Sequence, residues 1–192
     1  MKKKIKLITT FASLGLALAL MVFGVYAALT ETFTVTSSVN FTASKDILID
    51  FAVETTVAGE AELAGTDGAM IKTYTEGANG KVTANAGATH ANNLALKTVT
   101  YKAIGDKVTY TCTVTNYAEF AIVVTVTPPT ALTKNGKTLT SVTAATSFEV
   151  GASTGEGVTE THTVVIELLR SDVSFDAAEG AVTIGYSVTA KA

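Results

Sequence analysis

Side chains that could perform catalysis are few in this chain, and they lie far apart in the sequence. There are two histidines, His90 and His162, and one cysteine, Cys112. Neither histidine belongs to a His-Glu-x-x-His pair, so the zinc-peptidase pattern is missing. His162 begins the apolar face of a predicted strand, which favours a hydrogen-bonded histidine over a metal ligand, and His90 is expected to be solvated in a Gly/Ala/Asn-rich loop. Cys112 alternates in phase with the apolar residues of its strand, so we interpret it as a small core residue rather than a reactive thiol.

Other patterns that support chemistry are equally weak. The glycine-rich segment 151–157 lacks the Lys-Ser/Thr ending and the following helix of a phosphate-binding loop, which favours a flexible hairpin. No Gly-x-Ser-x-Gly elbow is present to activate a serine. Asp46 with Asp50, or Asp172 with Asp176, could contribute to a calcium site, but the spacing of an Asp-rich calcium loop is missing. We therefore expect no catalytic, cofactor-binding or metal-binding residue and no cofactor, and we do not expect an enzyme.

The elements that would position these residues are strands. The chain is rich in Thr, Val and Ala, and period-two runs of apolar residues recur along it with turn residues between them. The runs cover 33–41, 47–53, 94–101, 108–114, 120–126, 146–150, 162–168 and 182–188. Segment 57–93 is a weak region with only short apolar pieces, and one short helical turn is expected within 171–180.

Turn chemistry supports the same division. The apolar phase shifts by one residue at 97–98, which predicts a bulge. Pro128 and Pro129 should end the preceding strand, because proline cannot donate to the ladder. Asn135-Gly136 predicts a two-residue hairpin turn. Together these patterns predict an all-β fold, an antiparallel β-sandwich of jelly-roll-like topology.

The N-terminus has the order of a secretory signal. Four lysines among the first six residues precede a long uncharged run, and Val25 and Ala27 place small side chains at the −3 and −1 positions of a peptidase site. We therefore interpret 1–27 as a signal peptide, cleaved before Ala28 by a signal peptidase, and 28–192 as a single domain. The uncharged run could also supply the roughly 20 residues of a membrane span. A retained N-terminal anchor is the alternative.

The charge balance excludes one class of partner. The chain has 14 Lys and Arg against 17 Asp and Glu, a net charge of −3. Loss of the signal segment with its four lysines leaves ten basic and seventeen acidic residues, a net charge of about −7. Because no basic patch is present to meet phosphates, we expect no binding to nucleic acid. Contact with a membrane is expected only through the signal segment.

The signal region resembles that of the TasA/camelysin family, the biofilm-matrix fibre proteins of Gram-positive bacteria. In that family a Lys-rich start and a Leu/Ala-rich core lead into Gly-Thr-Tyr/Trp-Ala and then an aromatic residue. The matching residues here run from Gly24 to Ala27. Val25 replaces the usual threonine, and Leu29 stands near the expected aromatic position.

A second segment is similar to the same family. The turn 104–107, the strand that follows it to Asn116 and the segment 121–123 look like the family's Gly-Asp turn, strand, Asn-containing turn and returning strand. The resemblance implies a jelly-roll subunit that a dedicated signal peptidase processes and that is built into extracellular fibres. It also implies a location outside a Gram-positive-type bacterium, at the cell surface or in the biofilm matrix. The metallopeptidase activity attributed to some camelysin-like proteins has no support in these residues.

The first predicted strand suggests a mechanism of assembly. Cleavage would free the segment 28–43, whose apolar face carries Phe33, Val35, Val39 and Phe41. A strand with unpaired backbone groups can complete the sheet of a neighbouring subunit, and such a heterologous contact propagates into an open filament. We interpret 28–43 as a possible donor strand whose four apolar side chains fill the neighbour's core. The alternative is that the strand pairs within its own sandwich.

These observations predict a secreted structural protein, a subunit of an extracellular-matrix or cell-surface fibre whose main partner is a second copy of itself. The alternative belongs to another class: a monomeric Ig-like binding or adhesion module, held at the cell surface by an uncleaved N-terminal anchor. Self-assembly through the first strand would distinguish the first from the second.

Overall fold

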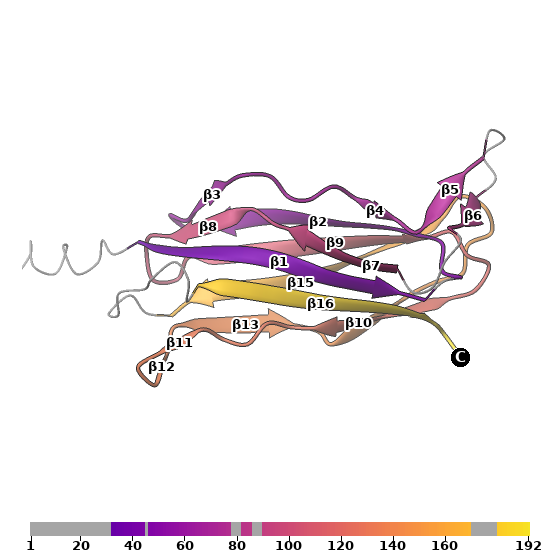
Figure 1. Cartoon of the computed structure of the whole chain (residues 1–192). Helices are drawn as coiled ribbons and strands as arrows, with labels where there is room; N and C mark the ends of the chain where they lie inside the picture. Colours follow the sequence, from indigo (N-terminus) through magenta and orange to yellow (C-terminus); the bar gives the residue numbers. More distant parts are fainter. Residues whose placement is uncertain (1–31, 45, 78–81, 86–89, 170–179) are drawn as a thin grey trace, which may run out of the picture.

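The computed structural model describes residues 32–44, 46–77, 82–85, 90–169 and 180–192. These residues form an elongated sandwich in which two large sheets run along its length (Figure 1). The described part of the chain is built of strands and contains no helix. The prediction of an all-β sandwich is therefore confirmed. The helical turn expected near 171–179 lies outside the described residues.

The first sheet has seven strands in the order β14, β10, β16, β1, β8 and β3, with β7 also paired to β1. Its strands are β1 (Phe33–Ala43), β3 (Glu62–Ala64), β7 (His90–Ala95), β8 (Thr98–Tyr101), β10 (Ile122–Thr127), β14 (Ser147–Val150) and β16 (Ala181–Ala190). We call it the β1 sheet, because β1 lies in its middle.

The second sheet has five strands in the order β13, β15, β9, β2 and β4, and we call it the β9 sheet. Its strands are β2 (Ile49–Ala58), β4 (Ile71–Lys72), β9 (Lys107–Asn116), β13 (Thr140–Ala144) and β15 (Val158–Leu168). Two small hairpins complete the described structure: β5 (Tyr74–Glu76) with β6 (Val82–Ala84), and β11 (Thr133–Lys134) with β12 (Lys137–Thr138).

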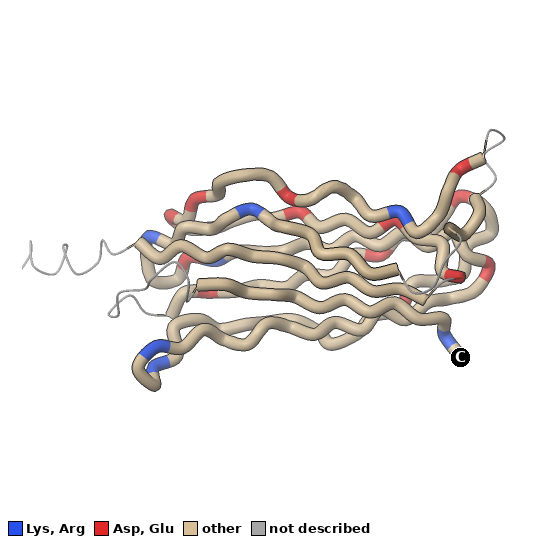
Figure 2. Tube along the Cα trace, in the orientation of Figure 1, with Lys and Arg blue, Asp and Glu red and all other residues tan. Residues whose placement is uncertain are grey.

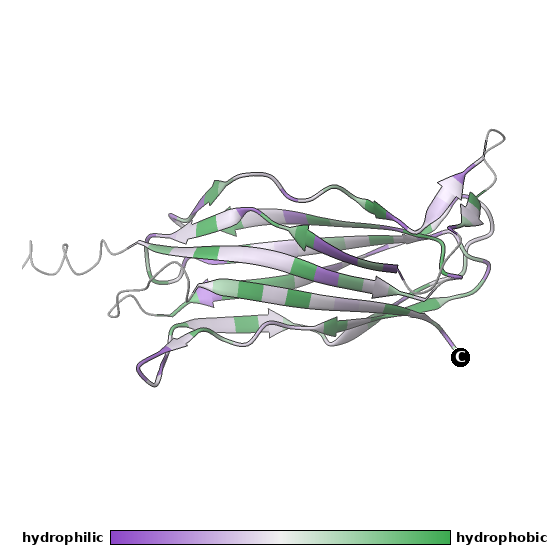
Figure 3. Cartoon of the chain, in the orientation of Figure 1, coloured by the Kyte–Doolittle hydropathy of each residue, from purple (hydrophilic) through white to green (hydrophobic). Residues whose placement is uncertain are grey.

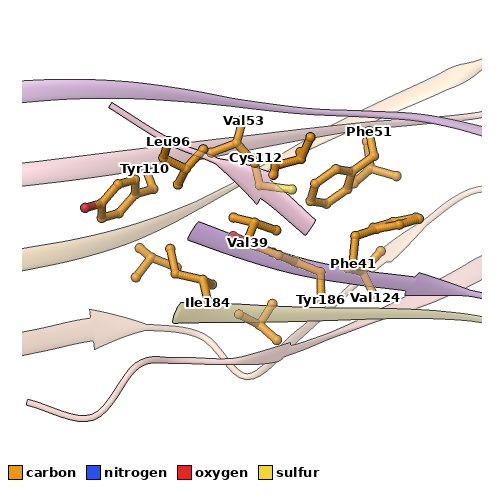
Figure 4. Close-up of a cluster of buried hydrophobic side chains, with 14 of the residues drawn as sticks. Val39, Phe41, Phe51, Val53, Leu96, Tyr110, Cys112, Val124, Ile184 and Tyr186 are labelled. Carbon is orange, nitrogen blue, oxygen red and sulfur yellow. The ribbon is translucent and has the colours of Figure 1, made fainter. Parts of the chain in front are cut away.

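The core lies between the two sheets. Alternate residues of each long strand point inward, and Figure 3 shows the resulting alternation of apolar and polar positions along β1 and β16. The largest fully buried side chains come from both sheets: Phe41 and Tyr186 from one, Phe51 and Tyr110 from the other. They meet in the middle of the sandwich together with smaller aliphatic residues (Figure 4).

The predicted turns are found where the sequence places them. The β1–β7 ladder pairs Ser38 with Ala95, whereas the β1–β8 ladder pairs Val35 with Val99, so one extra residue lies between the two ladders, as the predicted bulge requires. β10 ends just before the two prolines. In the β11–β12 turn, Asn135 has φ = 51° and Gly136 has φ = 71°.

The weak region 57–93 holds more structure than its pattern predicts. β2 continues to Ala58, and β3, β4, β5 and β6 are strands of only two or three residues. Strands this short cannot show a periodic pattern. β3 pairs with β8 and β4 pairs with β2, whereas β5 and β6 pair with each other. Asp67 contributes too, because its carboxylate accepts hydrogen bonds from the backbone N–H groups of Thr55 (2.9 Å) and Lys97 (3.0 Å).

Candidate assembly site

β1 is paired along both of its edges within its own chain. On one edge residues 36–43 pair with residues 181–188 of β16, and this pairing is parallel, so the sandwich is not purely antiparallel. On the other edge β8 pairs with residues 33–35 and β7 with residues 38–43, both antiparallel. β1 therefore occupies a slot between β16 and the β7–β8 pair.

The four predicted assembly side chains point into the core of their own domain. Phe33 is 6%, Val35 2%, Val39 0% and Phe41 1% exposed. The ring of Phe33 stacks on Tyr101 of β8, with centroids 5.7 Å apart. The ring of Phe41 lies 4.6 Å, centroid to centroid, from that of Phe51 in the β9 sheet (Figure 4). β1 is thus a structural part of both the sheet and the core.

This placement decides how residues 33–43 are used in the single chain: they pair within their own sandwich. Burial of each large apolar side chain stabilises the domain by roughly 1.5–3 kcal/mol. Residues 33–43 are therefore not the free donor strand considered above. Donation requires β1 to leave its slot and the β1 of another copy to take its place. The earlier part of the predicted donor, residues 28–31, lies outside the described residues.

A polar contact inside the core also holds β1. The side chain of Ser37 is 6% exposed, and its hydroxyl is hydrogen bonded to the phenol of Tyr110 in β9 at 2.5 Å. Burial raises the pKa of Tyr110 to about 12, so the phenol keeps its proton. Sequence reasoning did not single out Ser37, although the period of two places it on the same face as Val35 and Val39.

The connection between β1 and β2 is short. Ile47 N donates to Ser44 O (3.2 Å), and Ser44 N donates to Val188 O of β16 (3.2 Å). Ile47 itself is 1% exposed. β1 is the first described strand, so it is covalently joined to the other described strands only through this connection.

Two of the potentially reactive side chains named in the sequence analysis, Cys112 and His162, are enclosed in the core. Cys112 is 0% exposed, and burial raises the pKa of its thiol to about 12. His162 lies opposite Cys112 in the β9–β15 ladder, and burial lowers its pKa. A thiol that keeps its proton is a poor nucleophile. The interpretation of Cys112 as a core residue is confirmed.

His162 makes structural contacts. Its Nε2 lies 3.1 Å from the carbonyl oxygen of Ala145, and its ring stacks on Phe148 of β14 with centroids 5.2 Å apart and planes 6° apart. The predicted hydrogen-bonded role is therefore confirmed. The expectation for His90 was wrong: it begins β7, is half-buried, and has a buried Nε2 without a hydrogen-bond partner. Pairing with Ala43 of β1 draws this residue into the sheet.

The acidic residues considered for calcium do not form a cluster in the described structure. Asp46 is exposed, whereas Asp50 accepts a hydrogen bond from the Tyr117 hydroxyl (3.1 Å). Asp172 and Asp176 lie outside the described residues. Across the part of the chain that is described, no three His, Cys, Asp or Glu side chains lie close enough to hold a metal ion together.

Two loops are tied together at the end of the sandwich where β16 finishes. Asn116 Nδ2 donates to the carbonyl oxygens of Phe120 (2.9 Å) and Gly151 (2.8 Å). Ser153 Oγ accepts from the N–H groups of Gly155 (3.1 Å) and Gly157 (3.0 Å). The glycine-rich segment 151–157 is therefore a loop ordered by its own serine and by Asn116.

A shallow groove of about 510 Å³ lies beside these loops. Its lining includes Tyr117, Glu119 and the 38%-exposed Phe120, together with Asp46 and Val82. An aromatic wall with carboxylates beside it is a surface on which a polar ligand could rest. The sequence pattern placed Phe120 at the start of a predicted strand that covers 120–126, whereas β10 begins at Ile122 and leaves Phe120 in the loop before it.

Comparison with known protein families and with curated proteins finds no match for this chain. Among the described residues no helix is long and apolar enough to span a membrane. The predicted cleavage residues Val25, Ala27 and Ala28 lie outside the described part of the chain, so the signal peptide stays a prediction from sequence.

Proposed function

We propose that this protein is a secreted structural protein, a subunit of an extracellular fibre at the cell surface or in a biofilm matrix, and that its copies join by exchanging β1. The fibre role and the location follow from the signal-like N-terminus and from the resemblance to the TasA/camelysin family. In each junction, the β1 of one copy would occupy the slot between β16 and the β7–β8 pair of the next.

One observation carries this proposal: the first strand of the described domain lies in the middle of a sheet rather than at its edge. A terminal strand in a central position can be replaced by its equivalent from another copy with every pairing kept. Exchange of identical elements is a low-cost route to association for that reason. The contacts of Phe33, Val35, Val39 and Phe41 would be the same in the fibre as in the monomer.

The exchange can follow two courses. Reciprocal exchange between two copies closes into a dimer, whereas exchange that passes from each copy to the next forms an open filament. Only the second course makes a fibre. In either case the hydrogen bond from Ser44 N to Val188 O of β16 must break, because it holds the end of β1 in its own slot.

A pair of introduced cysteines tests the exchange directly. Ser38 of β1 and Thr183 of β16 lie on neighbouring strands, with their hydroxyl oxygens 3.2 Å apart. Disulfides link residues whose Cα atoms are about 4.4–6.8 Å apart, a range that suits strand neighbours. In the variant Ser38→Cys/Thr183→Cys, oxidation after assembly should join different subunits and give a ladder on a denaturing gel. Oxidation of the monomer before assembly should lock β1 in place and prevent filaments until a reductant is added.

The single variants Ser38→Cys and Thr183→Cys are the controls, and each should give at most a covalent dimer. Electron microscopy of the chain from Ala28 supplies the second readout. Filaments whose oxidation yields only monomers on the gel would show that β1 stays in its own slot. Only closed, cross-linked dimers without filaments would contradict the fibre role.

A second candidate function, a monomeric surface-binding module, is favoured by the tied loops and the groove beside Phe120. A pre-ordered concave surface with an exposed aromatic ring suits recognition of a glycan or peptide. Binding to a panel of cell-wall glycans that Phe120→Ala abolishes would support it. Leu169→Ala, which alters another exposed apolar side chain (45% exposed), should leave such binding unchanged.

A further inference from the structure

The outer face of the β1 sheet carries no charge over most of its width. The outward residues of β1 are Thr34, Thr36, Ser38, Asn40 and Thr42. The outward residues of β7, β8, β10 and β16 are all Thr, Ser, Asn, Ala, Gly or Val. In Figure 2 the strands of this face are almost entirely tan. Lys97, at the bulge between β7 and β8, turns its ammonium towards Asp67, 3.2 Å away.

Charges appear at the margins of this face, where they are paired. Glu149 of β14 is bonded to Lys191 at 2.6 Å along one edge, and Glu62 of β3 is bonded to Lys102 along the other. Protein interfaces have the same layout, with a centre depleted of charge and a polar, accessible rim. Ordinary surfaces mix both signs of charge throughout.

The β9 sheet provides the comparison within the same molecule. Its outer face is also rich in threonine, but Asp50, Glu54 and Lys72 lie on it together with the Lys107–Glu167 pair. A threonine-rich face of this sandwich can therefore carry charged residues. The absence of charge is a property of the β1 sheet.

The size of the face and the charge of the chain identify an occupant. Four to five strand positions about 4.8 Å apart, each about ten residues long at roughly 3.3 Å per residue, give about 600–800 Å². A standard protein interface buries about 800 Å² per partner. Copies of an acidic chain repel one another, so they approach most easily through a face without charge. A second copy also offers an identical surface of the same size.

We propose that the outer face of the β1 sheet is a self-association surface, on which a second copy packs through its own β1 sheet. The contact is isologous, because the same patch serves both partners. Twisted sheets pack with their strands about 30° apart and their planes about 10 Å apart. The side chains of this face are small, which allows this approach; beside Gly185 the space is filled by Thr127 of the neighbouring strand.

A single contact of this kind is weak, because hydroxyl groups exchange one hydrogen-bond partner for another with a small net gain. Many such contacts in parallel can nevertheless bind strongly. In a filament every subunit would present the same face, and linked weak contacts add to a strong one. Pairing of free copies stands without filaments, whereas the lateral joining of filaments rests on the proposed function.

The test places one negative charge on each outer face in turn. Ser187 of β16 lies inside the uncharged face and is exposed, and Thr161 of β15 is an exposed hydroxyl residue on the β9 sheet.

Sedimentation velocity measures the dimerisation of the chain from Ala28, which retains every described strand. Salt at about 1 M, where the Debye length is about 3 Å, removes general repulsion between copies. Ser187→Glu should weaken dimerisation at least about tenfold, whereas Thr161→Glu should change it less than about twofold.

Exchange of β1 must be separated from face-to-face packing. A second cysteine pair, Ala43→Cys/Val188→Cys, joins paired residues of β1 and β16 that are buried in the core, so its disulfide prevents exchange of β1 without altering the outer face. Dimers that persist in this oxidised background and disappear with Ser187→Glu come from the face. A wild-type chain that stays monomeric at high concentration and high salt would overturn the inference. Equal weakening by Thr161→Glu, with all variants folded by circular dichroism, would overturn it as well.

The two proposals can fail independently. Filaments that give the cross-linked ladder but bundle equally well with Ser187→Glu would remove the face inference and leave the fibre role. Reversible dimers sensitive to Ser187→Glu, in a chain that never forms filaments, would do the opposite.

Discussion

The two sheets of the sandwich are held together in different ways. In the β9 sheet, β9 pairs with ten residues of β2 on one side and ten residues of β15 on the other, all antiparallel. In the β1 sheet the central pair is β1 with β16, which is parallel and joins residues 145 positions apart in the chain. The other edge of β1 is divided between two short strands.

The difference indicates the order in which the sheets form. Closing a long loop costs entropy before any contact is gained, so long-range parallel pairing is slow. The β9 sheet can form from the middle of the chain, whereas the slot for β1 is complete only when β16 arrives. In the proposed exchange, β1 of the same chain and β1 of a neighbour would compete for this slot until then. The slot for β1, which is completed last, is therefore where the proposed exchange would begin.

The largest expected effect sharpens this contrast. Phe41 of β1 and Phe51 of β2 are both fully buried and in contact, so either change to alanine should cost about 3–5 kcal/mol of the free energy of unfolding, measured in urea. Only the stability that β1 contributes, and Phe41 with it, should be restored by adding a separate peptide, because β1 lies at the start of the described domain. A chain that begins at Ser44, given a synthetic peptide of residues 33–43, should regain a cooperative unfolding transition.

A peptide that carries Phe41→Ala should restore much less stability and serves as the control. If the chain from Ser44 unfolds with the same free energy with or without the peptide, β1 is dispensable. The proposed difference between the two sheets, that β1 can be replaced by an added copy, would then be contradicted.

Much of the fold could be predicted because the long strands alternate without interruption. The inward positions of β1, β9 and β16 are apolar at nearly every second residue, and the Asn135-Gly136 turn needs the positive φ that both residues tolerate. The jelly-roll topology stays a prediction. The strands between 58 and 93 were missed, because two or three residues carry no period and their pairing is set by distant neighbours.

The candidate site was predicted in part. The period of two identified which side chains of β1 point inward. The same alternation is expected whether these side chains pack in the core of their own chain or in the core of another copy. The partner strand β16 is 145 residues away and parallel, and alternation contains no information about pairing at that distance. Ser37 was missed for another reason: a hydroxyl on the apolar face has meaning only once its partner Tyr110 is known.

The hydrogen bond between Ser37 and Tyr110 tests whether the two sheets are joined by more than apolar packing. Tyr110→Phe should cost about 1–3 kcal/mol, because it leaves the Ser37 hydroxyl buried without a partner. Adding Ser37→Ala should recover part of that loss, since both polar groups are then absent. A double-mutant cycle in urea measures the coupling, and strictly additive effects would show that the contact does not join the sheets.

The smallest effect concerns His162, which joins the sheets through its stacking on Phe148. Burial lowers its pKa, an effect that the hydrogen bond with Ala145 O only partly offsets. The unfolded chain therefore binds a proton more readily than the folded one, so the full stability is present above the unfolded pKa of about 6.5 and declines as the pH falls below it. The free energy of unfolding in urea should show this decline between pH 8 and pH 5. In His162→Leu the free energy should change less with pH. Its value at pH 8 should also be lower, because the hydrogen bond to Ala145 is lost. A decline that survives in His162→Leu would assign the pH dependence to another group, and the ring stacking would then join the two sheets without making their contact sensitive to pH.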